Sequence, residues 1–367
     1  MFTPGPLTTS RTVKQAMLRD LGSRDVAFIA CVRQIRRTLL TLAGLSEEKR
    51  DHQAVIMQGS GTFGLESVIG STVPPEGKLL VIMNGAYGER IARIAEMLNI
   101  ETARLEYPPN RPPVAAEVDQ FLTDDRSITN VAVVHCETTT GIINPIEEIG
   151  IVVKEHEKSY FVDSMSAFGA VPFDFEKCGI DFLVSSANKC IEGVPGFSFA
   201  ICRRDSLLAT EGWARSMSLN LLAQWQGLEE NGQFRFTPPT HAILAFEQAL
   251  HELQAEGGVA GRAERYRDNH ETLVAGMREL GFSEYLRPEV QGAIITAFQY
   301  PSHSRFKFDE FYAGLNDRGF VIYPGKVSDI DCFRIGNIGH LFKRDMHSLL
   351  AAIRATLSEM QIEIPCR

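Results

Sequence analysis

The chain has 367 residues, 44% of them hydrophobic and 23% charged, an ordinary globular composition with enough apolar material for two domains. Its net charge of −9 argues against a nucleic-acid-binding protein, because phosphate backbones attract a surplus of Lys and Arg. No apolar run reaches the roughly 20 residues of a membrane span. The seven cysteines are scattered and contain no CxxC pair, so we expect a cytoplasmic protein without bound metal or disulfides.

Short apolar strands alternate with helical stretches from about residue 54 to residue 201. The first two helical stretches are Leu65–Gly70 and Gly88–Leu98. The strands are runs rich in Val, Ile and Phe: Ala54–Met57, Lys78–Met83, Val131–His135, Tyr160–Val162, Phe182–Val184 and Phe197–Ile201. Such strands separated by helices predict a mostly parallel sheet flanked by helices, in a large α/β domain over residues 21–258.

The pattern changes after about residue 242. An amphipathic helix over Ala242–Ala255 is followed by a charged helix, Arg262–Leu280, which looks like the connection to a second unit. That unit mixes strands and helices: Ala293–Phe298 (strand), Phe308–Arg318 (helix), Phe320–Tyr323 (strand), Phe333–Ile335 (strand) and Arg344–Met360 (helix). We therefore expect a small α+β domain over residues 259–367, with residues 1–20 packing near the active site.

A glycine-rich loop, Gly59-Ser60-Gly61-Thr62-Phe63-Gly64, follows a strand and opens a helix, as in dinucleotide-binding folds. A nicotinamide-dependent oxidoreductase is therefore one alternative. That fold needs an acidic residue at the end of the next strand, and Lys78–Met83 ends in Asn84-Gly85 instead. The loop still predicts a phosphate site, because N–H groups at a helix N-terminus attract anions. A plain strand-to-helix turn is the other interpretation.

An acid and a lysine follow two of the later strands. Asp163 ends the strand at Tyr160–Val162, and Lys189 comes after Phe182–Val184 and a short polar stretch. Pyridoxal phosphate needs an amine for a Schiff base, an acid beside its pyridine nitrogen and a phosphate site. Taken singly, Lys189 is better explained as a solvated loop lysine, and Asp163 as a strand-end turn residue or a helix cap. Their combination with the glycine loop predicts a pyridoxal-phosphate enzyme with Lys189 and Asp163 as catalytic residues.

Many ordered segments resemble one known family, and they span essentially the whole chain. They are Thr3–Ser10, Gln58–Thr62, Asn84–Gly88, His135–Gly141, Val162–Ser166, Ser185–Cys190, Gly193–Gly196, Phe236–His241, Tyr323–Lys326 and Phe333–Gly339. The chain resembles the class V aminotransferases of the fold-type I pyridoxal-phosphate superfamily. Within that family it is most similar to the enzymes that transfer the amino group of 2-aminoethylphosphonate to pyruvate.

The resemblance implies a set of cofactor-binding residues around Asp163 and Lys189. They are Ser60, Gly61 and Thr62 at the phosphate, Tyr87 stacked on the pyridine ring, Thr138 at the ring oxygen and Asn188 beside the lysine. It also implies that Thr237 and Thr240 reach the phosphate of a neighbouring subunit, so that a homodimer shares its active sites. Arg334 matches the residue that holds the substrate's acid group, and its planar fork suits a carboxylate or a phosphonate.

One segment departs from the 2-aminoethylphosphonate enzymes. Leu21-Gly22-Ser23-Arg24-Asp25-Val26 is more similar to a stretch of the alanine–glyoxylate and serine–pyruvate aminotransferases. Arg24 is therefore expected either near the active-site entrance or paired with Asp25.

We expect transamination between small molecules, from 2-aminoethylphosphonate to pyruvate, giving phosphonoacetaldehyde and L-alanine. The alternatives are alanine–glyoxylate or serine–pyruvate transamination, a lyase acting on a substituted aminoethylphosphonate, the oxidoreductase named above, and a binding protein without catalysis.

Overall fold

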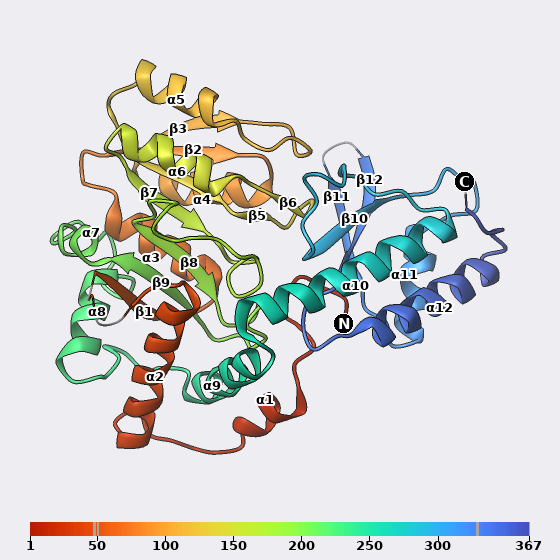
Figure 1. Ribbon diagram of the computed structural model, residues 1–367, viewed down its shortest axis with the longest axis horizontal. Helices are drawn as coiled ribbons and strands as arrows, with labels where there is room; N and C mark the ends of the chain where they lie inside the picture. The colour runs from red at the N-terminus through yellow and green to blue at the C-terminus, as the bar shows by residue number, and fades with distance from the viewer. Residues whose placement is uncertain (47–48, 50, 328–329, 367) are drawn as a thin grey trace.

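The computed structural model describes residues 1–46, 49, 51–327 and 330–366. These residues form a seven-stranded sheet (the large sheet), a three-stranded sheet (the small sheet), a two-stranded ribbon and the helices around them. Figure 1 shows the large sheet and its helices in one unit and the small sheet in another, with the long helix α10 running between them. No helix among these residues is long and apolar enough to cross a membrane.

The large sheet has the strand order β1-β9-β8-β7-β4-β2-β3. Its strands are β1 (His52–Gln58), β2 (Lys78–Met83), β3 (Glu101–Glu106), β4 (Ile128–Val134), β7 (Ser159–Asp163), β8 (Phe182–Ser186) and β9 (Phe197–Arg203). Among the described strands of this sheet, β9 alone runs against the direction of the others, antiparallel to its neighbours β8 and β1. The prediction of a mostly parallel sheet flanked by helices is therefore confirmed.

Helices cover the large sheet and continue past it. They are α1 (Arg11–Ala16), α2 (Val26–Leu42), α3 (Gly61–Thr72), α4 (Ala86–Met97), α5 (Ala115–Asp124), α6 (Ile146–Glu155), α7 (Arg204–Leu208), α8 (Leu221–Glu230), α9 (Thr240–Ala255) and α10 (Gly258–Leu280). Helix α3 packs on β8, β9 and β1, while α6 packs on β7. The ribbon is formed by β5 (Cys136–Glu137) and β6 (Ile142–Ile143).

The small unit contains β10 (Ile295–Gln299), α11 (Phe308–Asp317), β11 (Tyr323–Val327), β12 (Ile330–Gly336) and α12 (Lys343–Glu359). The predicted strand at Phe320–Tyr323 was wrong: the N–H of Phe320 donates to the Leu315 carbonyl at the end of α11, and pairing with β12 begins only at Tyr323. Strand β11 lies at an edge, where a residue without an N–H such as Pro324 is tolerated.

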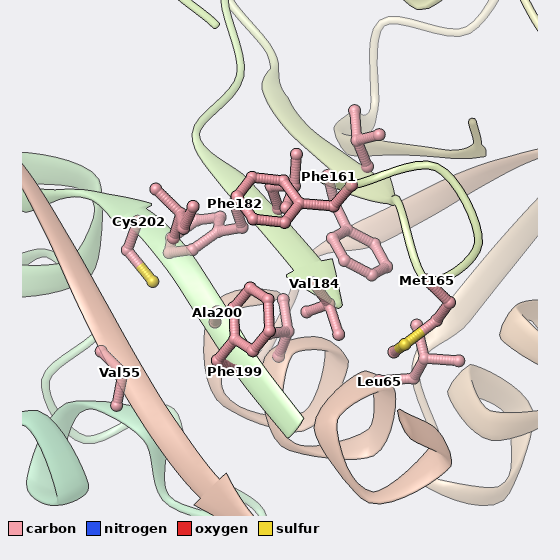
Figure 2. Packing of buried hydrophobic residues seen from close by; sticks show 14 of the residues in the cluster. Val55, Leu65, Phe161, Met165, Phe182, Val184, Phe199, Ala200 and Cys202 are labelled. Carbon is pink, nitrogen blue, oxygen red and sulfur yellow. The ribbon is translucent and has the colours of Figure 1, made fainter. Parts of the chain in front are cut away.

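A tightly packed core lies where α3 meets the large sheet. Figure 2 shows it, with these residues labelled: Val55, Leu65, Phe161, Met165, Phe182, Val184, Phe199, Ala200 and Cys202. Phe199 and Val184 are at most 1% exposed, and burying such a side chain stabilises the fold by about 1.5–3 kcal/mol. This packing makes β8 a rigid support for the residues that follow it.

The seven cysteines are buried and free.

The N-terminal segment runs between the two units. The N–H of Phe2 donates to Val321, the N–H of Gly336 donates back to Phe2, and the N–H of His340 donates to Thr8. These hydrogen bonds join residues 1–20 to the small unit. The predicted domain limits at residues 20 and 258 therefore stay predictions.

Candidate active site

The carboxyl edge of the large sheet gathers most of the predicted site residues. Strands β1, β2, β4, β7 and β8 run in the same direction, so the loops that follow them meet at one edge. The predicted residues on these loops, or on the first turns of the helices that follow them, are Ser60, Gly61, Thr62, Tyr87, Thr138, Asn188 and Lys189, with Asp163 ending β7.

The glycine loop leaves the first turn of α3 open. Ser60 is its N-cap, and within the described chain the Ser60 side chain makes no capping hydrogen bond. A Cβ atom at Gly61 would lie 2.7 Å from the sulfur of Met165, so a larger residue would crowd this turn. The first N–H groups of a helix lack intrahelical partners and carry partial positive charge. The loop can therefore bind a phosphate through its backbone and the hydroxyls of Ser60 and Thr62.

Asp163 is buried, with 1% of its surface exposed. Its Oδ1 accepts the N–H of Met165 at 3.0 Å, whereas Oδ2 is buried without a partner among the described residues. Burial raises the pKa of Asp163 to about 7, although the Met165 hydrogen bond and the Lys189 charge oppose the rise. An unpartnered buried oxygen is costly, so this carboxylate is suited to a ligand that brings a donor.

Lys189 stands on a tight turn just beyond β8. The N–H of Glu192 donates to the Lys189 carbonyl at 2.7 Å, and the N–H of Gly193 donates to Ala187 at 2.9 Å. The amine, Nζ, donates to the carbonyl of Pro4 at 2.8 Å, which brings the N-terminal segment to the site. Burial lowers the pKa of Lys189, so a larger share of the amine is neutral than in water.

Glu137 organises the side of the site that holds Tyr87. It is fully buried, and its Oε2 accepts the N–H groups of Tyr87 at 3.1 Å and Gly88 at 3.3 Å. Burial raises the pKa of Glu137, while the hydrogen bonds from Thr139 oppose the rise. No role for Glu137 was predicted from the sequence. Its position two residues after the predicted strand Val131–His135 was the available signal, but its partners lie about 50 residues away.

Arg334 reaches the same edge from the small sheet. Its Nη1 donates to the Thr138 carbonyl at 3.1 Å, and its Nη2 donates to Pro324 at 3.1 Å. Nε is buried without a partner among the described residues, and the guanidinium lies 4.6 Å from the centre of the Tyr323 ring. Burial lowers the pKa of Arg334, while Tyr87 and Tyr323 oppose this effect. The structure thus places an arginine donor beside Thr138.

Three predicted residues lie less directly at this edge. Thr237 is exposed, and its carbonyl accepts a hydrogen bond from Gln58 Nε2 at 3.4 Å. Thr240 opens α9 and is half-buried. Within the described residues, no hydrogen bond joins either threonine to Ser60–Thr62 of the same chain. Arg24 is exposed, and Asp25 Oδ2 accepts the N–H of Gly22 at 2.6 Å.

The family described as aminotransferase class-V matches residues 11–326 of the chain. The chain is a class V aminotransferase. It is 49% identical over 359 residues to 2-aminoethylphosphonate–pyruvate transaminase from Salmonella paratyphi C (strain RKS4594), covering 97% of both chains. It is 51% identical over 356 residues to the enzyme of the same name from Vibrio cholerae serotype O1 (strain ATCC 39541), covering 96% of both.

Solved structures show the same fold for this aminotransferase. Pyridoxamine–pyruvate aminotransferase from Mesorhizobium loti has a TM-score of 0.88 at 23% identity, over 99% of this chain and 93% of that one. Alanine–glyoxylate aminotransferase from Nostoc sp. has a TM-score of 0.88 at 23% identity, over 97% of this chain and 95% of that one. Membership of the family decides against the oxidoreductase and against a binding protein without catalysis.

The cofactor of this aminotransferase is pyridoxal phosphate, and the edge residues fit it. Oδ2 of Asp163, which has no partner among the described residues, can accept the N–H of a protonated pyridine ring. The partly neutral amine of Lys189 suits a bond to the aldehyde carbon. The open first turn of α3 suits the phosphate.

Proposed function

We propose that this aminotransferase moves the amino group of 2-aminoethylphosphonate to pyruvate, giving phosphonoacetaldehyde and L-alanine. The observation that carries the choice of substrates is the 49–51% identity, over nearly the full length, to transaminases named for these two compounds. The half-buried guanidinium of Arg334 supports it, since both substrates carry an acid group that such a fork can bind.

Lys189 is proposed to act as both the anchor of the cofactor and the proton carrier. When bound, pyridoxal phosphate supplies an electron sink for the negative charge that develops on the substrate carbon. When free, the Nζ atom of Lys189 would take the proton from the substrate carbon and hand it to the cofactor carbon on the other side of the amino nitrogen. The lowered pKa of Lys189 favours the neutral form that can accept this proton.

Asp163 and the glycine loop are proposed to hold the two ends of the cofactor. Oδ2 of Asp163 would keep the pyridine nitrogen protonated, which strengthens the sink. Ser60, Gly61 and Thr62 would bind the phosphate. The remaining contacts are proposed for Tyr87 on the ring face, Thr138 at the ring oxygen and Asn188 beside the phosphate.

Arg334 is proposed to bind the phosphonate in the first half-reaction and the pyruvate carboxylate in the second. Its hydrogen bonds to Thr138 and Pro324 use Nη1 and Nη2 while Nε is left over, so binding an acid group satisfies a buried donor. One anion site used in turn by donor and acceptor explains how a single active site serves both substrates.

We further propose a homodimer in which Thr237 and Thr240 reach the partner's phosphate site. Phe236, next to Thr237, is 39% exposed, and Phe63 on the first turn of α3 is 52% exposed. Large apolar side chains exposed beside an active site fit a surface that a second copy covers. The seven free, buried cysteines fit a cytoplasmic enzyme.

The experiment follows the visible absorbance of the pyridoxal-phosphate-loaded protein after mixing with 2-aminoethylphosphonate, L-alanine or L-serine, each without pyruvate. We expect 2-aminoethylphosphonate to remove the visible absorbance band of the bound cofactor and pyruvate to restore it. A response to alanine and serine but not to the phosphonate would move the enzyme to the alanine–glyoxylate or serine–pyruvate group. Lys189→Ala is the control, and turnover by this variant would overturn the mechanism.

A further inference from the structure

A largely buried group of charged and polar side chains lies behind the turn that carries Lys189. It consists of Glu192, Glu256, Arg262, Arg265 and Tyr266, which we call the Glu192 cluster. Glu192 is 3% exposed, and Arg262 and Tyr266 are each 1% exposed. Charges buried this deeply are costly unless every one of them is paired. The contacts of the cluster show what its members hold in place.

The cluster binds the residues directly after Lys189. Arg262 Nη1 donates to the carbonyl of Cys190. Oε1 of Glu192 accepts hydrogen bonds from Tyr266 at 2.6 Å and from Arg265 Nη2 at 2.7 Å. All three donors stand on α10, so this helix holds the turn from behind.

Glu192 has a backbone conformation that needs such support. Its φ angle is +67°, in the left-handed region that residues other than glycine rarely adopt. The conformation turns the chain so that Glu192 N–H reaches the Lys189 carbonyl while the Glu192 side chain points to α10. The side-chain contacts therefore stabilise the turn on which the lysine stands.

The same side chains also hold the segment that follows the strand of Arg334. Arg265 Nη1 donates to the carbonyls of Gly339 at 2.6 Å and Leu341 at 2.9 Å. The N–H of Gly339 donates to the Tyr266 hydroxyl at 3.1 Å. Figure 1 shows α10 lying between the unit of β8 and the unit of β12, which this cluster ties together.

We propose that Glu192 is a positioning residue for Lys189: through Arg265 and Tyr266 it holds the lysine turn in register with the strand of Arg334. The inference rests on the proposed roles of Lys189 and Arg334. The amine must meet the substrate carbon while the acid group is held by the arginine, so the separation of these two residues decides how well the proton transfer is aligned. Loosening Glu192 therefore lowers the rate of proton transfer more than it weakens substrate binding.

The test compares Glu192→Ala, Glu192→Gln and Tyr266→Phe with Glu284→Ala. Glu284 is the matched control, because it pairs with Arg278 near the other end of α10, at 2.5 Å. Two quantities are measured: the rate at which cofactor-free protein takes up pyridoxal phosphate, seen as visible absorbance, and kcat and KM for the amino donor.

We expect Glu192→Ala to slow uptake and to lower kcat on the order of 10-fold or more, within the ~100-fold that a small misplacement can cost, with KM nearly unchanged. Glu192→Gln keeps the acceptor oxygen, so its rate of cofactor uptake and its kcat should both lie close to those of the wild type. Tyr266→Phe keeps the ring and loses the hydroxyl between Glu192 and Gly339, so a smaller loss is expected. Glu284→Ala should behave as the wild type.

Wild-type uptake and kcat in folded Glu192→Ala would overturn the proposal, as would equal losses in Glu192→Ala and Glu284→Ala. If Glu192→Ala does not fold, Tyr266→Phe decides, and wild-type rates in that variant would overturn the proposal too. Uptake by Lys189→Ala that matches the wild type would refute the proposed cofactor site instead, so the two failures are distinguishable.

Discussion

Replacing Asp163 with Asn in the cofactor-free protein tests the energetics of the buried carboxylate. Burial raises its pKa from an ordinary 3.8 to about 7. Between these pH values the folded protein holds a proton that the unfolded chain has lost, so stability falls as the pH rises through this window. At ~1.4 kcal/mol per unit, the full shift corresponds to a cost of about 4 kcal/mol above pH 7. Asn carries no such cost.

The pH dependence separates this effect from the other consequences of the substitution. The amide of Asn places an unpaired N–H where Oδ2 was, which costs about 1–3 kcal/mol at every pH. Between pH 5 and pH 8 the free energy of unfolding of the wild type should fall by about 3 kcal/mol because of Asp163. In the variant this position should contribute no such fall. The stability of the variant relative to the wild type should therefore rise by that amount.

Urea unfolding of both cofactor-free proteins at pH 5 and pH 8 measures the difference. Adding pyridoxal phosphate should then stabilise the wild type more than the variant, because the ring N–H gives Oδ2 its partner. An equal difference between the two proteins at both pH values would refute the account of Asp163 as a buried carboxylate with a raised pKa.

Three further substitutions have expected outcomes. Arg334→Lys keeps the positive charge but loses the paired N–H donors of the planar guanidinium. In steady-state assays KM for both 2-aminoethylphosphonate and pyruvate should therefore rise about 10- to 100-fold. A rise for one substrate alone would contradict the shared anion site. Gly61→Ala puts a Cβ atom 2.7 Å from the sulfur of Met165 and should weaken pyridoxal phosphate binding roughly 10-fold, about 1.4 kcal/mol, in a fluorescence titration. Gly70→Ala, on the same helix but with its nearest neighbour at 3.3 Å, is the control and should bind normally. Phe199→Ala removes a ring that is 1% exposed and should lower the free energy of unfolding by about 3–5 kcal/mol; a loss below ~1 kcal/mol would show that the core closes around the gap.

The sequence predicted the strands that are apolar on both faces. The run Lys78–Met83 matches β2 at both ends, and Ala54–Met57 falls inside β1. Strand β3 was not predicted, because it lies at the sheet edge and its residues, Glu101–Glu106, are polar or half-exposed. The direction of β9 could not be predicted, since an apolar run has the same pattern in parallel and antiparallel strands.

The site was predictable where a residue follows a strand. Asp163 and Lys189 come after strands of one parallel sheet, so their meeting at one edge follows from the fold. The contact between Pro4 and Lys189 was not predictable, because it joins positions 185 residues apart through a backbone carbonyl. The same holds for Glu192, whose role depends on side chains more than 70 residues along the chain.

The most direct measurement is the amount of phosphonoacetaldehyde formed when the pyridoxal-phosphate-loaded enzyme is mixed with excess 2-aminoethylphosphonate and no pyruvate. A transaminase with its cofactor on Lys189 can accept one amino group per site and must then stop. We predict one equivalent of phosphonoacetaldehyde per bound cofactor, with further turnover and L-alanine only after pyruvate is added. Continued turnover without pyruvate would contradict transamination and identify a lyase, and no phosphonoacetaldehyde at all would contradict the proposed donor.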